Sequence, residues 1–151
     1  PMIESVEEAQ KAVSATRYPP KGIRGVSGSS RATKFGRISD YMSKVEDETT
    51  IILQIESAAA INKAVEIGSV EGVSGVFFGP SDIAADIGLL GQPMHENVWK
   101  LIKPVAQTLI SKGIPVGTLV LDTDFAAELL NEGFSFVTCA IDSDLLAKAS
   151  G

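Results

Sequence analysis

Four short apolar runs, each followed by a segment with helical spacing, constrain the fold of this chain more than any other feature. The runs are TTIILQIE (49–56), VSGVFFGP (73–80), IPVGTLVL (114–121) and FSFVTCAI (134–141). Their apolar residues are continuous rather than alternating, as in strands that are buried on both faces of a parallel sheet. Because parallel strands need crossover connections, usually helices, this order predicts an α/β fold.

The segments between the runs predict the helices of this fold. We expect helices over 6–18, 38–48, 57–70, 95–113, 122–133 and 142–150, and a helical turn that opens at residue 81. Ser57 stands at the expected start of the third helix, where its side chain can cap the first N–H groups. Residues 22–36 are rich in glycine, serine and basic side chains, so we expect a loop there with a short extended piece, IRGV (23–26).

Two architectures are open within the α/β class, a (β/α) barrel and an open doubly wound sheet. No GxGxxG or GxxxxGK[ST] motif follows any expected strand, so the best marker of a nucleotide-binding open sheet is missing. The chain holds four strand–helix units, which is about half of the eight in a TIM barrel. Its first residues, PMIES (1–5), look like the exit of a strand that begins upstream.

Charge and composition limit the partners that the chain can bind. The 151 residues are 44% hydrophobic and carry a net charge of -6, which argues against nucleic acid or an anionic membrane surface as a partner. No apolar run approaches the roughly 20 residues that span a bilayer, and no signal-peptide pattern is present. The single cysteine, Cys139, lies within FVTCAI, so we expect a buried structural thiol and a reducing, cytoplasmic compartment.

Two carboxylates follow neighbouring runs. Glu56 ends the first run and Asp82 follows the second, and function collects at the carboxyl ends of parallel strands. Adjacent strands lie about 4.8 Å apart, so the two side chains can converge. Close carboxylates repel each other unless a proton or a cation intervenes, and oxygen ligands suit hard ions such as Mg²⁺ or Mn²⁺. The pair would leave coordination positions open for water and a chelating substrate.

The neighbours of this pair predict a place for a substrate carboxylate. Gln54 lies two residues before Glu56 and so projects to the same side of the strand. Gly79, Pro80 and Ser81 form a tight turn that opens a helix, which leaves the N–H groups of Ser81 and Asp82 unbonded. A 2-oxo acid could chelate the metal through its keto oxygen and one carboxylate oxygen, with the carboxylate lying on those N–H groups.

Plainer roles remain open for each of these residues taken alone. Glu56 and Asp82 could serve only as charges at helix starts, where each stabilises by about 0.3–1 kcal/mol. His95, the single histidine, stands at the start of a long helix and is expected to be a surface or capping residue. Arg24 and Arg31 lie in the Gly/Ser-rich loop, where they could touch an anion or remain solvated.

Four longer stretches together resemble a known family. They are RYPPKGIRGVS (17–27), ILQIES (52–57), GVFFGPSDIAADIG (75–88) and FVTCAIDSDLLAKA (136–149). In combination they resemble the HpcH/HpaI aldolases over essentially the whole chain, and SRATKFG (30–36) is similar to the dehydro-deoxyglucarate branch. The resemblance implies a class II aldolase on a (β/α)8 TIM barrel of the pyruvate-aldolase type. Such enzymes cleave a 4-hydroxy-2-oxo acid, such as 2-dehydro-3-deoxyglucarate, to pyruvate and an aldehyde, and they are usually homo-oligomers, often hexamers.

The resemblance also implies roles for particular residues. Glu56 and Asp82 match the two metal-binding carboxylates, for which Mg²⁺ or Mn²⁺, and also Co²⁺, are the expected ions. The positions that match substrate-binding ones are Gln54, Gly79, Pro80, Ser81 and Asp82. Leu119, at a later strand end, matches an apolar position on the aldehyde side of the site.

The family's general-base histidine, the aspartate that supports it and an arginine lie N-terminal to Pro1, so no catalytic residue of that kind is expected in this chain. The resemblance therefore implies that residues 1–151 form the C-terminal half of a single (β/α) barrel domain, inactive as an isolated fragment. Two alternatives stay open. One is a non-catalytic half-barrel that acts in structure or assembly, and the other is an enzyme like the citryl- or malyl-CoA lyases, which share the strand-end carboxylates but lack RYPP-GIRGV.

Overall fold

The computed structural model describes residues 1–150 as an α/β fold with a single parallel sheet. Its strands are β1 (Ile52–Ile55), β2 (Gly75–Phe78), β3 (Val116–Leu119) and β4 (Phe136–Thr138), and they lie side by side in sequence order. The predicted α/β class and strand order are confirmed. Each strand is shorter than its apolar run, because only the middle of each run pairs with a neighbour.

Eight α-helices and one 3-10 helix connect and flank these strands among residues 1–150. They are α1 (Val6–Thr16), the 3-10 helix Arg31–Thr33, α2 (Tyr41–Glu48), α3 (Ala58–Ile61), α4 (Ala64–Gly68), α5 (Pro80–Asp86), α6 (Glu96–Ser111), α7 (Thr123–Asn131) and α8 (Asp142–Ser150). None of these described helices is long and apolar enough to cross a membrane. The expected helices are therefore present, with one local difference.

The difference is that the single helix expected over 57–70 is divided into α3 and α4. The side-chain amide of Asn62 donates to the carbonyl oxygen of Ala58 at 3.1 Å, the oxygen that the backbone N–H of Asn62 would use in a continuous helix. IRGV (23–26) lies within the loop expected over 22–36 and is not part of a strand. Instead, the N–H of Ile23 donates to Ser14 O and that of Arg24 to Arg17 O, which fold this piece back against the end of α1.

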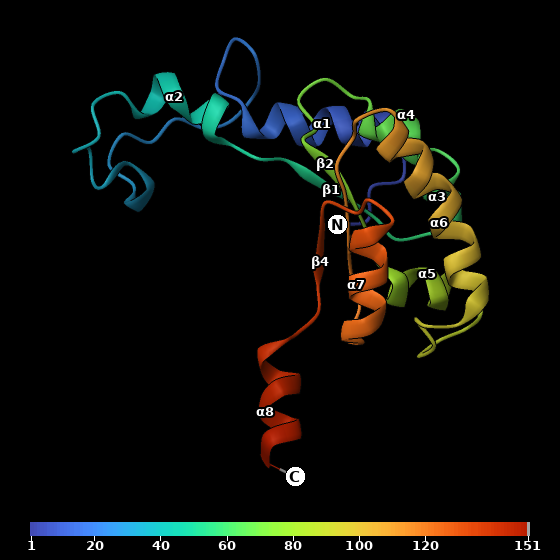
Figure 1. The fold of residues 1–151 in the computed structure, drawn as a ribbon. Coiled ribbons are helices and arrows are strands. Elements are labelled where there is room, and N and C mark those ends of the chain that lie inside the picture. Colours follow the sequence, from blue (N-terminus) through green and yellow to red (C-terminus); the bar gives the residue numbers. More distant parts are fainter. Residues whose placement is uncertain (151) are drawn as a thin grey trace.

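One face of the sheet packs against the helices and forms the core (Figure 1). The side chains buried on this face are Leu53, Ile55, Val76, Phe78, Val116 and Thr118. Thr118 is the one polar member of that set, and its hydroxyl donates to Phe78 O at 3.0 Å. Helix α6 supplies the largest apolar stripe, in which Val98, Ile102, Ala106 and Leu109 recur at three- and four-residue spacing and are fully buried.

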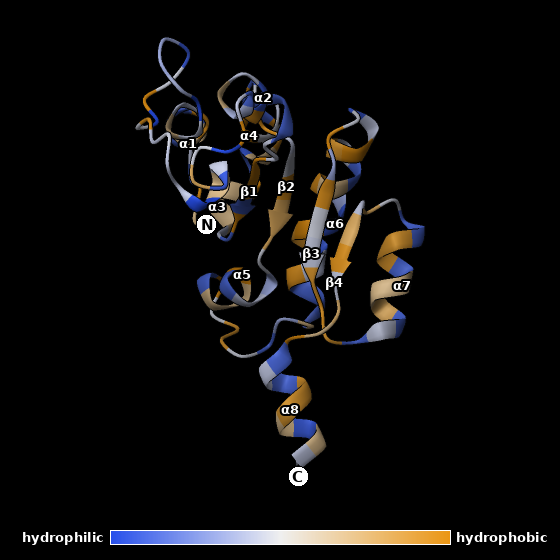
Figure 2. Ribbon diagram, turned by 90° about the vertical axis from the view of Figure 1, so that its left-hand side faces the viewer, coloured by the Kyte–Doolittle hydropathy of each residue, from blue (hydrophilic) through white to orange (hydrophobic). Residues whose placement is uncertain are grey.

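The opposite face of the sheet is not covered by any described helix, and Figure 2 looks onto it. A shallow cavity of about 270 Å³ on this face is lined by Ile52, Gln54, Phe77 and Phe136. The rings of Phe77 and Phe136 stack with their centroids 6.0 Å apart. The continuous apolar runs are typical of a sheet that is covered on both faces. Residues 1–150 cover one of these two faces.

Cys139 is exposed, so the expectation of a buried thiol was wrong. Strand β4 is an edge strand that ends at Thr138, and Cys139 follows it in the connection to α8. An apolar run does not reveal which strand will lie at the edge of a sheet, and it is this position that leaves the cysteine without cover.

Gly117 gives a test of how the open face is packed. A Cβ built on Gly117 would lie 2.1 Å from Cζ of Phe136, whereas one on Gly25 would meet nothing within 4 Å. We expect Gly117→Ala to lower the free energy of unfolding by about 1–3 kcal/mol through overpacking. Gly25→Ala is the control, and urea unfolding followed by Trp99 fluorescence is the measurement. Equal stability of the two variants would show that Phe136 does not lie over Gly117.

Candidate functional site

The carboxyl ends of β1 and β2 place Glu56 directly beside Gly79. Ile55 pairs with Phe78 in the parallel ladder, and the N–H of Gly79 donates to Ile55 O at 3.0 Å. A Cβ built on Gly79 would lie 2.8 Å from Cγ of Glu56 and 3.1 Å from its Oε1. A side chain at position 79 would therefore displace the carboxylate of Glu56 that lies against it.

The Glu56 side chain is nearly buried, with 7% of the residue exposed, and is held by two neutral donors. Its Oε1 accepts from the amide nitrogen of Gln54 at 3.4 Å, and its Oε2 accepts from the N–H of Met2 at 2.5 Å. The prediction that Gln54 and Glu56 project to the same side is confirmed. No Lys or Arg within residues 1–150 forms an ion pair with Glu56.

The contact with Met2 was missed by sequence reasoning. Residues 1–4 run along the free edge of β1, where the N–H of Ile3 donates to Gln54 O at 3.0 Å. The interpretation of PMIES (1–5) as the end of a strand was the only indication that residues 1–4 would lie beside the sheet. It could not indicate that the segment would reach a residue 54 positions away in the chain.

Helix α5 begins directly after β2 and presents unbonded N–H groups at its start. Gly79 takes the N-cap position and Pro80 the first helical position, where its missing N–H costs nothing. The first backbone bond of the turn runs from Ile83 N to Gly79 O at 3.1 Å. Among the described residues, no acceptor lies within hydrogen-bond distance of the N–H groups of Ser81 or Asp82. Ser81 is therefore not the cap of this helix, and its side chain is exposed.

Asp82 stands in the first turn of α5, three residues after the glycine on which Glu56 lies. Asp86, at the other end of this helix, bonds to the start of α3, where its Oδ2 accepts from the N–H of Ala58 at 2.8 Å. Within residues 1–150, no three or more His, Cys, Asp or Glu side chains are placed to hold a metal ion. Any ion at this edge would thus have at most two ligands of these types from the described chain.

A second cavity, of about 270 Å³, opens beside the start of α5. It brings together two residues singled out from the sequence, Ser81 and Leu119, the last residue of β3. Its other lining residues are Pro93, Met94, Val120, Leu121, Asp122 and Ile141. Pro93 and Met94 come from the loop between α5 and α6, which carried no chemical signal in the sequence. The mostly apolar lining suits an uncharged part of a ligand.

The remaining candidate residues have local roles. His95 takes the N-cap position of α6, and its Nδ1 accepts from Asn97 N at 3.1 Å, as expected for a capping residue. The guanidinium of Arg24 lies 4.7 Å from the centre of the Tyr18 ring and donates to the Tyr41 hydroxyl at 3.2 Å. Arg24 therefore belongs to the structure of its own loop, and Arg31 is exposed.

In chemical terms, this edge of the sheet combines oxygen donors with unbonded N–H donors. The carboxylate of Glu56 has lone pairs beyond those used by Met2 and Gln54. A helix start with free N–H groups attracts a carboxylate or another anion. A ligand with both a metal-chelating oxygen and a carboxylate would use the two kinds of donor together.

Comparison with known proteins places this geometry in one family. A sequence profile described as HpcH/HpaI aldolase/citrate lyase matches residues 1–149. A Rhizobium etli protein named pyruvate aldolase is 45% identical over 150 residues, which cover 99% of this chain and 59% of that protein. A Shigella flexneri protein named 4-hydroxy-2-oxo-heptane-1,7-dioate aldolase is 42% identical over 151 residues, covering 99% and 57%.

A solved structure gives the same result. The crystal structure of a HpcH/HpaI aldolase/citrate lyase family protein from Burkholderia cenocepacia matches with a TM-score of 0.92 at 34% identity, over 99% of this chain and 60% of that one. The chain thus spans 57 to 60% of the length of these relatives. It belongs to the HpcH/HpaI aldolase/citrate lyase family.

Proposed function

We propose that residues 1–151 are the metal- and carboxylate-binding part of a class II aldolase. This enzyme cleaves a 4-hydroxy-2-oxo acid to pyruvate and an aldehyde, in the catabolism of aromatic or sugar acids. The names of two relatives, pyruvate aldolase and 4-hydroxy-2-oxo-heptane-1,7-dioate aldolase, support the reaction class. The observation that carries the proposal is the carboxylate of Glu56 against Gly79, at the end of the sheet where α5 begins with free N–H groups.

Glu56 and Asp82 are the ligands we assign to a divalent ion, Mg²⁺ or Mn²⁺, with Co²⁺ as a further candidate. The residues fit such an ion, because Glu56 is 7% exposed and its donors are neutral. A nearly buried carboxylate without a positive partner is costly, and a bound cation removes that cost. Oxygen ligands are also the kind that these hard ions prefer.

The chain's own groups would divide the work as follows. The N–H groups of Ser81 and Asp82 bind the carboxylate of the 2-oxo acid and fix its direction. Gln54 holds the Glu56 carboxylate in place through the 3.4 Å contact. The mostly apolar cavity that includes Leu119 would contact the aldehyde part of the substrate. When bound, the ion would polarise the keto group and stabilise the negative charge that develops on cleavage.

Proton transfer is the part of the reaction for which residues 1–151 offer no group at this site. His95, the single histidine, caps α6. We propose that the base and the arginine come from a preceding part of the same barrel domain, of which residues 1–151 are the C-terminal half. We also propose that the complete protein is a homo-oligomer, as the family resemblance suggests.

Glu56→Ala in the protein that contains this chain should abolish metal-dependent pyruvate release. We expect a loss of about 10²-fold or more, since the ion stabilises charge in the transition state. Glu71→Gln is the control, because Glu71 is exposed and precedes β2 at the other end of the sheet. Metal-stimulated release by the Glu56 variant, at a rate near that of the control, would disprove the ligand assignment.

Substitutions at Ser81 separate a backbone contact from a side-chain contact. Ser81→Pro removes the N–H that is proposed to bind the substrate carboxylate, whereas Ser81→Ala keeps it. Hydrogen bonds to charged groups contribute about 1.5–3 kcal/mol, so the proline variant should raise the inhibition constant of pyruvate about tenfold or more. The alanine variant should change it little. Equal effects, at matched thermal stability, would point to the hydroxyl as the contact.

Residues 1–151 alone should not release pyruvate from a 4-hydroxy-2-oxo acid at the rate of a complete family member. The measurement couples pyruvate release to lactate dehydrogenase in the presence of Mg²⁺ or Mn²⁺. Turnover by this chain would exclude the open alternative that these residues act only in structure or assembly. Full turnover by this chain would show that its own residues supply the base.

A further inference from the structure

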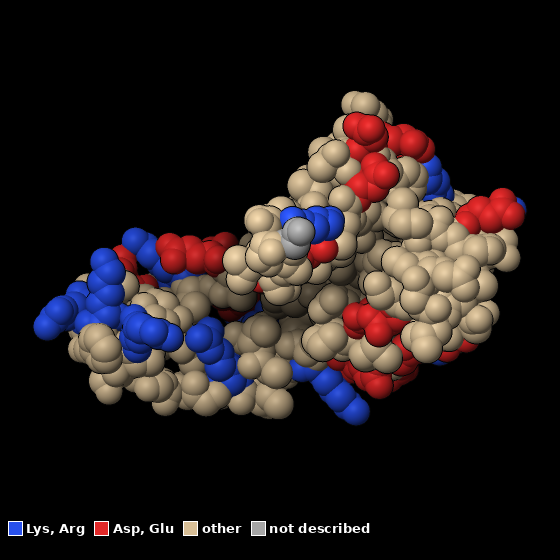
Figure 3. All heavy atoms as spheres, turned by 90° about the horizontal axis from the view of Figure 1, so that it is seen from below, with Lys and Arg blue, Asp and Glu red and all other residues tan. Residues whose placement is uncertain are grey.

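The charges of this chain are divided very unevenly along the sequence. Residues 17–39, here called the basic arm, contain six Lys and Arg and no Asp or Glu. The rest of the chain holds the other seven Lys and Arg against all nineteen Asp and Glu. A strongly positive segment is thus attached to a strongly negative body. Figure 3 shows much of the blue surface gathered at the left end of the molecule, where the arm lies.

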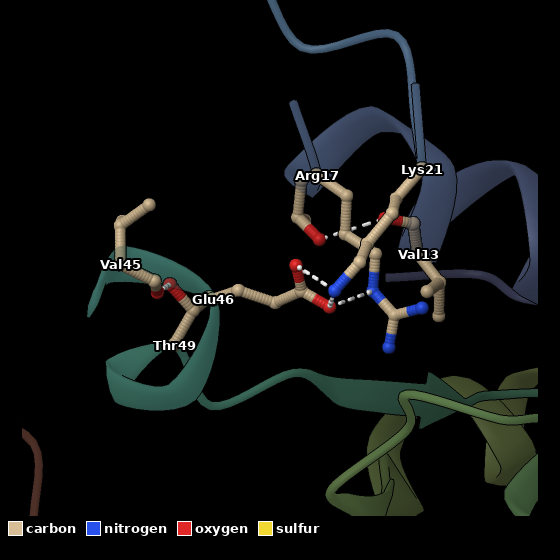
Figure 4. A network of polar contacts seen from close by, with 7 residues as sticks. Val13, Arg17, Lys21, Val45, Glu46 and Thr49 are labelled. Atoms are coloured by element: carbon tan, nitrogen blue, oxygen red, sulfur yellow. Dashed lines mark hydrogen bonds and ion pairs between the residues drawn. The ribbon is translucent and has the colours of Figure 1, made fainter. Parts of the chain in front are cut away.

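The root of the arm is fixed to the body. Arg17 and Lys21 both reach Glu46 of α2, with nitrogen–oxygen distances of 3.7 and 3.1 Å (Figure 4). The chain turns so closely under α1 that a Cβ on Gly22 would lie 2.3 Å from Ser14 O. These contacts give the arm a defined direction away from the sheet (Figure 1).

The tip of the arm is folded on itself. Thr33 is 2% exposed; its hydroxyl donates to Ser30 O at 2.8 Å and accepts from Gly36 N at 3.0 Å. Lys34 and Phe35 have φ values of 47° and 58°, in the left-handed region that non-glycine residues seldom adopt. Backbone strain of this kind is often found at functional sites.

The arm presents apolar side chains together with its cations. Ile23, Val26 and Phe35 are 76%, 70% and 67% exposed. Arg31, Lys34 and Arg37 are exposed as well and form no ion pair within residues 1–150. A surface that is both apolar and cationic fits a partner surface that is apolar and acidic.

Such a surface exists on the body of the chain, and we call it the acidic corner. It comprises Asp122, Asp124, Asp142 and Asp144 at the starts of α7 and α8, with the exposed Leu121, Ile141, Leu145 and Leu146 near them in the sequence. Within the described chain only Lys148 neutralises it, through an ion pair with Asp144 at 2.8 Å. Helix α8 buries none of its residues and extends away from the sheet (Figure 1).

The arm and the corner of one molecule lie at opposite ends of the sheet. The arm leads through α2 to the amino end of β1, whereas the corner follows the carboxyl ends of β3 and β4. We propose that the basic arm docks on the acidic corner of a second copy of this chain. The inference rests on the proposed homo-oligomer but not on the aldolase reaction. It favours a second copy over nucleic acid, since the body that carries the arm is strongly acidic.

Zero-length crosslinking between isotopically distinct copies tests this docking. The protein is prepared with ¹⁴N and ¹⁵N, mixed, and treated with a carbodiimide, which joins an amine to a carboxylate in direct contact. We expect mixed-isotope crosslinks from Lys34 to the corner aspartates. Their yield should fall severalfold at 0.5 M NaCl, because the electrostatic screening length shortens from about 10 Å at 0.1 M salt toward about 3 Å at 1 M. Lys112, exposed and outside the arm, is the internal control.

Three outcomes would overturn the proposal. One is that Lys34 forms mixed crosslinks to the corner no more often than Lys112 does. The second is that Arg31→Gln, Lys34→Gln and Arg37→Gln combined leave the association constant from sedimentation unchanged. Association through the open sheet face would give that second result. The third is that a 20-base single-stranded nucleic acid binds tightly to the protein with the unsubstituted arm and does not bind to the triple variant. That result would identify nucleic acid as the partner of the arm. None of these results depends on metal binding or pyruvate release, so failure here leaves the proposed reaction untouched.

Discussion

The contact of the Glu56 carboxylate with the backbone of Gly79 is the constraint on which the rest of this site depends. It exists because two parallel strands end in register, with Ile55 opposite Phe78. It also requires a glycine, since a Cβ at position 79 would lie 2.8 Å from Glu56 Cγ. The same glycine is the N-cap of α5. One residue therefore positions the carboxylate and starts the helix whose first N–H groups face outward.

The core determines how firmly this junction is held. Leu53 and Ile55 of β1 and Val76 and Phe78 of β2 are buried against the helices. The side chains that alternate with them lie on the other face, where Gln54 and Glu56 meet. A slip of one residue between β1 and β2 would exchange these two sets, so the apolar packing also fixes the register of the functional groups.

Local patterns were sufficient to predict the strands, their parallel order and the polar groups at their ends. Continuous apolar runs, the Gly-Pro turn and the position of Glu56 are all visible in short windows of sequence. The break at Asn62 was not predictable in this way, because it depends on a side chain that takes the carbonyl oxygen of Ala58. Burial of Cys139 was wrongly expected, because a run of apolar residues does not indicate which strand will be at the edge.

Contacts between segments that are distant in the chain could not be predicted from the sequence either. The bond from Met2 N to Glu56 Oε2 joins residues 54 positions apart, and the cavity beside Ser81 draws Met94 from a loop without any motif. The left-handed conformations of Lys34 and Phe35 depend on the hydrogen bonds around Thr33. These features follow from the assembled fold, not from local propensity.

The central claim is that Glu56 and Asp82 bind one divalent ion. Mn²⁺ binding, followed through the electron paramagnetic resonance signal of the free ion, measures this directly and needs no turnover. We expect one saturable site per chain that is lost in Glu56→Gln and in Asp82→Asn, kept in Glu71→Gln, and weakened at acid pH, because the ligands must be ionised. A site of unchanged affinity in both carboxylate variants, or no saturable binding by the unsubstituted protein, would contradict it.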